Sequence, residues 1–174
     1  MNIILEGTDG TGKSTTIQNL LNYFTGENEK LFTVIYNTGV KMEDEYRYDY
    51  MIQTYKNMWK TCRKLDHIIF DRSHISESVY AEMYRGQNTD ELFKVEMKAP
   101  EDTYLIMLTD NIENLLKKED GLSLSKNRDS KMKELSLFND SFRRSNLKKM
   151  KIDISQNTEE QVIKKIIKFI KENK

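Results

Sequence analysis

The chain has 174 residues, and its 28 basic and 28 acidic side chains leave a formal net charge of zero. This length suits a single domain over residues 1–174, and the balanced charge favours a small phosphorylated ligand over a nucleic-acid polymer. One cysteine, Cys62, excludes an internal disulfide, and no apolar stretch approaches the length of a membrane span, so we expect a soluble, cytoplasmic protein that binds no membrane.

Apolar runs of strand length recur along the chain, and most of the stretches between them carry helical periodicity. Strands that alternate with helices favour an α/β protein, in which a parallel sheet lies between two layers of helices. Sheets of this kind bind ligands at the C-terminal ends of their strands. The runs expected to form five strands are residues 2–6, 32–36, 67–70, 103–108 and 150–154.

The turn after the first expected strand matches a phosphate-binding pattern, Gly7-Thr8-Asp9-Gly10-Thr11-Gly12-Lys13-Ser14. A helix is expected to follow, because Ile17, Leu20, Leu21 and Phe24 recur at the spacing of one helix face. The glycines let backbone N–H groups converge on an anion, and the helix N-terminus favours negative charge. Lys13 would reach the β- and γ-phosphates of a nucleotide, and Ser14 would hold Mg²⁺. The expected contacts to this nucleotide, which the resemblance described below implies to be ATP, come from Gly7, Asp9, Gly10, Thr11, Gly12, Lys13, Ser14 and Thr15.

Residues 46–65 carry aromatic side chains at helical spacing. Tyr55 or Trp59 could stack on a nucleotide base, with Gln53 or Asn57 reading its edge. The alternative, that the aromatic residues only pack this helix onto the sheet, is the more common arrangement for any one of them.

The third expected strand ends in Asp71-Arg72. At this edge of the sheet an acid can hold the water shell of a metal, and an arginine can bind a phosphate through two parallel hydrogen bonds. Considered alone, such a pair is more often a structural salt bridge. His74, just after it, is expected on the surface at the start of a helix.

The last third of the chain contains one irregular and one regular segment. Residues 117–130 are polar, contain a glycine and several serines, and are interpreted as a mobile lid or, equally, as a plain surface loop. Thr158 and Gln161 form a capping box for a final helix. Its buried stripe is expected to be Val162, Ile163, Ile166, Ile167 and Ile170.

Two of these segments resemble motifs of the thymidylate kinases and their deoxynucleoside monophosphate kinase relatives. Residues 5–15 are similar to that family's E-G-x-D-G-x-G-K-S-T loop, and Asp71-Arg72-x-x-x-Ser76-x-x-x-Tyr80 is similar to its D-R-x-x-x-S-x-x-x-Y/F segment. Residues 99–102 look like the proline-led approach to the family's fourth strand. The resemblance spans most of the chain and implies the P-loop kinase fold. It also implies transfer of the γ-phosphate of ATP to a deoxynucleoside monophosphate, with dTMP as the foremost acceptor.

Carried over by position, the resemblance implies a role for each matching residue. Lys13 and Ser14 serve the ATP phosphates and Mg²⁺, and Asp71 supports the metal and the transferred group. Arg72 binds the acceptor monophosphate, and Asp9 contacts the acceptor's sugar or phosphate side. Ser76 and Tyr80 line the pocket for the acceptor. Relatives often form homodimers, so the resemblance also implies a possible homodimer.

The resemblance also implies an arginine in the lid. Relatives without an arginine in the phosphate loop tend to supply one from the lid, and Gly10 stands at that loop position here. Arg128 is the only arginine in residues 117–130, so we expect it to act on the transferred phosphate. Arg143 and Arg144 are the reserve, although an expected helix there makes surface charge their ordinary explanation.

The chain departs from the family pattern in two places. After the second expected strand the family has an Arg-(Glu)-Pro phosphate contact, whereas this chain has Asn37-Thr38-Gly39-Val40-Lys41, where Lys41 could substitute as a point charge. Lys117 and Lys118 stand where arginine is common.

Two other functions stay open. One is a deoxynucleoside kinase, in which Glu43 or Glu45 would take the proton of the 5′-hydroxyl. The other is a nucleotide-binding regulator with little catalysis, which the Lys13-Ser14 and Asp71-Arg72 pairs disfavour.

Overall fold

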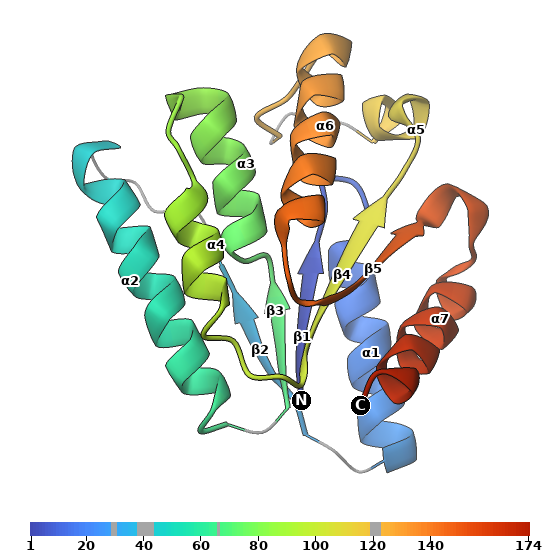
Figure 1. Ribbon diagram of the computed structural model, residues 1–174. Coiled ribbons are helices and arrows are strands. Elements are labelled where there is room, and N and C mark those ends of the chain that lie inside the picture. Colours follow the sequence, from blue (N-terminus) through green and yellow to red (C-terminus); the bar gives the residue numbers. More distant parts are fainter. Residues whose placement is uncertain (29–30, 38–43, 66, 119–122) are drawn as a thin grey trace.

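Five parallel strands form one central sheet, in the order β2-β3-β1-β4-β5 (Figure 1). The computed structural model describes residues 1–28, 31–37, 44–65, 67–118 and 123–174. The strands are β1 (Asn2–Glu6), β2 (Thr33–Tyr36), β3 (Ile68–Asp71), β4 (Thr103–Thr109) and β5 (Lys148–Asp153). The helices are α1 (Lys13–Asn28), α2 (Asp44–Cys62), α3 (His74–Arg85), α4 (Asp90–Glu96), α5 (Ile112–Lys117), α6 (Arg128–Arg144) and α7 (Glu159–Glu172), with the 3-10 helix η1 (Ile154–Gln156) after β5.

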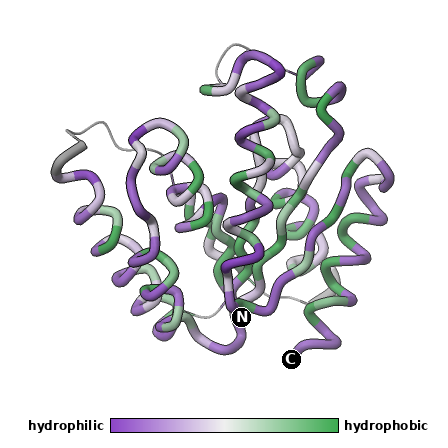
Figure 2. The backbone as a smooth tube through the Cα atoms, turned by 45° about the horizontal axis from the view of Figure 1, so that its top comes forward, coloured by the Kyte–Doolittle hydropathy of each residue, from purple (hydrophilic) through white to green (hydrophobic). Residues whose placement is uncertain are grey.

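Helices cover both faces of the sheet, which gives the three layers that the sequence predicts. On one face α1 and α7 pack against Ile3 and Leu5, and on the other α2, α3, α4 and α6 pack against Ile4 (Figure 1). Alternate residues of β1 therefore enter different cores, as the two-residue period of a strand requires. Figure 2 shows the hydrophobic segments gathered in the central strands and on the inward sides of the helices.

The strand order reverses at β1, which lies between β3 and β4. All five residues of β1 are buried, as a central strand with both faces covered requires. In open α/β sheets, ligands bind where the order reverses, beyond the C-terminal ends of the strands. The loop after β1, which carries the phosphate-binding pattern, starts at this point.

The expected α/β/α fold and five-stranded parallel sheet are confirmed. The last strand starts at Lys148, two residues before the apolar run expected to form it. The reason is that backbone pairing with β4 defines the strand, and this pairing already begins with Tyr104 opposite Lys148. The capping box of α7 is present in both directions, with Thr158 N–H donating to Gln161 and Gln161 N–H donating to Thr158. Cys62 is buried. Among the described residues, no helix combines the length and the apolar character that crossing a bilayer requires.

His74 differs from its prediction. It begins α3 as expected, but it is fully buried, and its Nε2 lies 2.7 Å from Glu96 Oε2. Glu96 also accepts hydrogen bonds from Ser145 Oγ and Asn146 N–H, both at 2.6 Å. Burial opposes ionisation, but these three partners together hold the pKa of Glu96 below its usual value. The sequence did not indicate this network because its members are far apart in the chain.

Candidate active site

A cleft of about 1630 Å³ runs along the C-terminal edge of the sheet. It extends from the start of α7, across the phosphate loop and the end of β3, to a wall formed by α2 and α3. Most of the predicted site residues line it. These are Asp9, Gly10, Thr11, Gly12, Lys13, Ser14, Thr15, Tyr55, Asp71, Arg72, Ser76 and Tyr80.

The loop between β1 and α1 has its shape because of its glycines. Gly7 has a φ of 141°, and a Cβ there would lie 2.3 Å from the carbonyl oxygen of Leu108, so no other residue fits. The backbone N–H groups of Gly10, Thr11 and Gly12 donate no hydrogen bond to any residue that the structure describes. Together with the N-terminus of α1, these donors have the arrangement that the sequence predicts for a phosphate cradle.

Lys13 lies inside this loop. Its Nζ donates hydrogen bonds to the carbonyl oxygens of Gly7 at 3.1 Å and Thr8 at 3.0 Å, and its side chain is only 8% exposed. Burial, and next the positive charge of Arg72, lower the pKa of Lys13 to about 8. The site therefore holds a partly desolvated ammonium group where an anion would be stabilised strongly.

Arg72 reaches the cleft from a strained position. Its φ of 71° is uncommon for a residue other than glycine. Its N–H donates to Leu5 O at 2.9 Å, and its own carbonyl accepts from Asn37 Nδ2 at 2.6 Å. These contacts hold the backbone in place. Asn37 was not predicted as a site residue, because only the fold brings it beside the end of β3.

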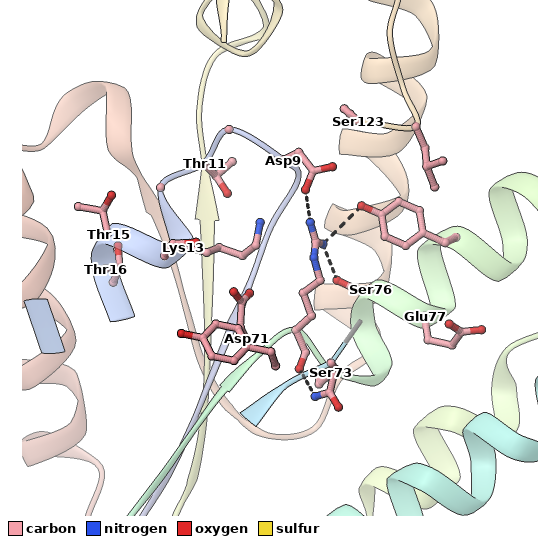
Figure 3. A pocket seen from close by; sticks show the side chains of 18 of the residues that line it. Asp9, Thr11, Lys13, Thr15, Thr16, Asp71, Ser73, Ser76, Glu77 and Ser123 are labelled. Carbon is pink, nitrogen blue, oxygen red and sulfur yellow. Dashed lines mark hydrogen bonds and ion pairs between the residues drawn. The ribbon is translucent and has the colours of Figure 1, made fainter. Parts of the chain in front are cut away.

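The guanidinium of Arg72 joins the loop to α3. It pairs with Asp9 and donates to Ser76 Oγ at 2.9 Å, to Gly7 O at 3.2 Å and to Tyr80 OH at 3.4 Å (Figure 3). The cluster of Asp9, Arg72, Ser76 and Tyr80 that the resemblance implies is therefore assembled. Because Asp9 is about half exposed, its place on the guanidinium is open to exchange with an incoming anion.

Glu6 supports this cluster from the end of β1, and the sequence analysis missed it. It is fully buried and accepts hydrogen bonds from Ser73 N–H at 2.6 Å, Ser73 Oγ at 2.7 Å, Ser76 N–H at 3.2 Å and Ser76 Oγ at 2.5 Å. A carboxylate at the start of α3 suits the positive end of that helix. The sequence signal that could have identified Glu6 is the glutamate that opens the loop motif. From the sequence alone, this glutamate was interpreted only as the last residue of a strand.

Two oxygen donors in the cleft fit a Mg²⁺ ion. Asp71 Oδ1 is buried and has no hydrogen-bond partner among the described residues, and the exposed Ser14 lines the same cleft. Figure 3 shows Asp71 close to Lys13. Mg²⁺ prefers oxygen ligands, keeps several waters, and in phosphate sites uses one or two protein groups plus phosphate oxygens. The chemistry of Ser14 and Asp71 thus agrees with their expected metal role.

Of the two aromatic candidates on α2, only Tyr55 lines the cleft. Trp59 is 1% exposed, packs edge-to-face with His74 and is not part of the lining. Gln53 and Asn57 are exposed and lie outside the lining as well. Here the structure supports the packing alternative for Trp59, because one further helical turn carries it past the cleft and into the core.

Of the two cationic side chains expected near the lid, Lys118 rather than Arg128 lies against the glycine loop. Lys118 Nζ lies 3.3 Å from Gly10 O and 2.8 Å from Asp110 Oδ2, and it lines the cleft. Arg128 is over half exposed, pairs with Glu113 at 2.6 Å and does not line the cleft. Residues 119–122, between them, lie outside the described residues.

The reserve arginines make surface contacts, as the alternative explanation expects. Arg143 pairs with Asp140 at 2.6 Å within α6, and Arg144 pairs with Asp90 at 2.6 Å. Arg144 also lies 4.0 Å above the ring of Phe93. Neither lines the cleft.

Three solved structures are similar to this chain over nearly its whole length. The YorR protein of Bacillus subtilis, solved in complex with phosphorylated GDP, has a TM-score of 0.72 and 21% identity and covers 98% of this chain and 96% of its own. Thymidylate kinase from Candida albicans has a TM-score of 0.63 and 17% identity, covering 99% and 91%. Deoxyadenosine kinase from M. mycoides, solved with dCMP and dCDP, has a TM-score of 0.63 and 16% identity, covering 99% and 100%.

The chain has the P-loop kinase fold. At these identities the similarity establishes the fold alone. No protein-family model and no curated protein matches the sequence.

Proposed function

We propose that this protein is a nucleoside monophosphate kinase that uses ATP and Mg²⁺ to phosphorylate a deoxynucleoside monophosphate. The sequence resemblance implies dTMP as the acceptor (ATP + dTMP → ADP + dTDP), and the phosphate chemistry is the same for every base. One observation carries the proposal: a single cleft holds a phosphate cradle and, beside it, the guanidinium of Arg72. A donor and an acceptor phosphate could therefore meet there.

Different residues of this chain would bind the donor phosphates of ATP and the phosphate of the acceptor. Lys13 and the loop N–H groups would bind the β- and γ-phosphates. Arg72 would exchange Asp9 for the acceptor phosphate, which it can grip through two parallel hydrogen bonds. Because a phosphate monoester is largely dianionic near neutral pH, the attacking oxygen needs no general base.

Positive charge around the transferred phosphoryl group would stabilise the transition state. Mg²⁺, when bound, bridges phosphate oxygens and offsets their developing charge, and Ser14 and Asp71 would hold it. Lys118 lies over the loop at Gly10 and would add a further cation. Phosphoryl transfer depends mostly on positioning and charge, so these groups account for the reaction without covalent chemistry by the protein.

An ADP-release assay tests the proposal. Purified protein with ATP and Mg²⁺ is supplied with each deoxynucleoside monophosphate in turn, and release should depend on the acceptor. Lys13→Ala should abolish turnover while circular dichroism stays that of the wild type. Turnover like that of the wild type in this variant would contradict the proposal.

A deoxynucleoside kinase is the second candidate, favoured by the fold similarity to deoxyadenosine kinase. It would phosphorylate a 5′-hydroxyl and would need a general base. Glu43, one candidate base, lies outside the described residues, as does the side chain of Glu45. Release of ADP with thymidine or another deoxynucleoside, but not with its monophosphate, would favour this second function.

A further inference from the structure

Three charged side chains gather on the α2–α3 wall of the cleft, and the phosphate chemistry uses none of them. Glu77 and Arg85 lie on α3 and Arg47 lies on α2, and all three line the cleft. Their side chains are 6%, 9% and 20% exposed, respectively. Glu77 Oε1 pairs with Arg85 Nη2, and Arg47 Nε lies 4.0 Å from the same oxygen. Figure 3 shows Glu77 next to Ser76 on the helix, with its carboxylate pointing away from Asp9.

This cluster is incompletely satisfied. Arg47 Nε is buried and has no hydrogen-bond partner, and Glu77 Oε2 accepts no hydrogen bond from any described residue. Burial raises the pKa of Glu77, and the two arginines oppose that effect. A desolvated polar group is costly unless it is paired, so the buried Arg47 Nε, beside a carboxylate oxygen of Glu77 that can still accept, indicates a ligand that completes the cluster.

The position of the cluster indicates which part of the ligand it meets. Ser76, the neighbour of Glu77, accepts a hydrogen bond from Arg72, the proposed partner of the acceptor phosphate. Arg85 lies eight residues further along α3, a rise of about 12 Å. A nucleotide held by its phosphate at Arg72 can therefore extend its base toward Glu77 and Arg85. The aromatic residues Tyr55 and Tyr84 line the same wall.

We propose that Glu77, Arg85 and Arg47 bind the edge of the acceptor base and select a base with an exocyclic amine over thymine; this rests on the proposed phosphate transfer and replaces dTMP, which the sequence resemblance implies, as the preferred acceptor. A carboxylate only accepts hydrogen bonds and a guanidinium only donates them. Cytosine and adenine each present an amine beside a ring-nitrogen acceptor, and guanine presents an amine and a ring N–H beside a carbonyl acceptor, so each offers donors to the carboxylate and an acceptor to a guanidinium. Thymine presents a single N–H between two carbonyl oxygens, so the second carboxylate oxygen would face a carbonyl.

Steady-state kinetics with dCMP, dAMP, dGMP and dTMP test this selection. The wild type should show its highest kcat/KM with an amine-bearing monophosphate. Glu77→Gln should lower that value roughly 5- to 150-fold, the range for loss of one two-point base contact, and mainly through KM. The dTMP value should stay level or rise, because an amide can both donate to and accept from thymine. The matched control is Glu82→Gln, an exposed glutamate on the same helix, which should change nothing.

A second variant guards against misfolding. Glu77→Gln leaves two partly buried arginines without their anion, whereas Arg47→Gln removes a group whose Nε has no hydrogen bond to any described residue. Arg47→Gln should fold and should also reduce the preference for the amine-bearing monophosphate. If the wild type prefers dTMP, or if these variants change all four acceptors equally, the inference is wrong.

Binding of the four monophosphates without ATP separates this inference from the proposed function. Selective binding that is lost in Glu77→Gln, with no phosphate transfer to any acceptor, would keep the inference and refute the kinase. Phosphate transfer to all four acceptors that is unchanged in Glu77→Gln would support the kinase and refute the inference.

Discussion

Replacing Lys13 with Met should stabilise the nucleotide-free protein at neutral pH. The pKa of Lys13 falls from 10.5 to about 8 on folding. At about 1.4 kcal/mol per pH unit, holding the charged side chain in this site costs the folded state about 3 kcal/mol below pH 8. The variant also loses two hydrogen bonds, each worth about 1 kcal/mol, to Gly7 O and Thr8 O. The net gain expected for Lys13→Met near pH 7 is about 1 kcal/mol.

The difference in unfolding free energy between Lys13→Met and the wild type should change sign with pH. Between pH 8 and 10.5 the unfolded chain keeps a proton on Lys13 that the folded protein has released, so the stability of the wild type rises with pH relative to the variant. From pH 7 to pH 10 the difference in unfolding free energy should move by about 2.5 kcal/mol in favour of the wild type. Other titrating groups are common to both proteins and cancel in this difference.

Urea unfolding at several pH values, followed by the fluorescence of Trp59, measures the difference. The same two proteins are then compared by thermal shift with ATP and Mg²⁺, which should stabilise only the wild type. Parallel pH profiles for the two proteins would refute the argument that Lys13 is held charged against a desolvation cost.

Two further predictions concern the loop and the lid. Gly7→Ala should destabilise the protein by about 3 kcal/mol or more in urea unfolding, because its Cβ would meet Leu108 O, whereas Gly26→Ala in α1, with no atom nearby, should gain about 0.5–1 kcal/mol. Equal effects of these two substitutions would contradict the account of the loop. Lys118→Ala should lower kcat at least tenfold in the ADP-release assay, as expected for a lost charge contact in the transition state. Arg128→Ala should change kcat little, since Arg128 pairs with Glu113 at the surface; a larger loss in Arg128→Ala would restore the role that the sequence resemblance gives it.

The sequence predicts the parts of this protein that depend on local chain chemistry. The loop around Lys13 follows from glycines at fixed spacing, and the start of α7 from the Thr158–Gln161 capping box. What it does not show are contacts between distant segments. Glu6 reaches Ser73 and Ser76, about seventy positions away, and sequence reasoning interpreted it only as the end of a strand.

The hydrophobic periodicity of α2 likewise does not predict which of its aromatic residues lines the cleft. Tyr55 and Trp59 share one helix face, so their spacing predicts burial for both, and both are buried. Which of them meets a ligand depends on the position along the helix axis, and four residues correspond to about 6 Å. Both rings pack edge-to-face with His74, but that distance places Tyr55 in the lining of the cleft and Trp59 outside it. A hydrophobic pattern can therefore identify a face but not the end of the helix where a site lies.

The end of the cleft at Arg72 and Tyr80 is also connected to the segment that follows residue 122. Tyr80 donates a hydrogen bond from its hydroxyl to Glu134 Oε1 at 3.0 Å, and Lys131 lies 3.3 Å from the other oxygen of that carboxylate. Lys131 in turn donates to Ser123 Oγ at 2.9 Å, and both charged side chains are 1% exposed. Breaking a buried pair is costly, so Ser123 is held at the cleft by a contact that also orients Tyr80 beside Arg72. If Arg72 binds the acceptor phosphate as proposed, substitutions at Ser123 or Lys131 should therefore alter acceptor binding.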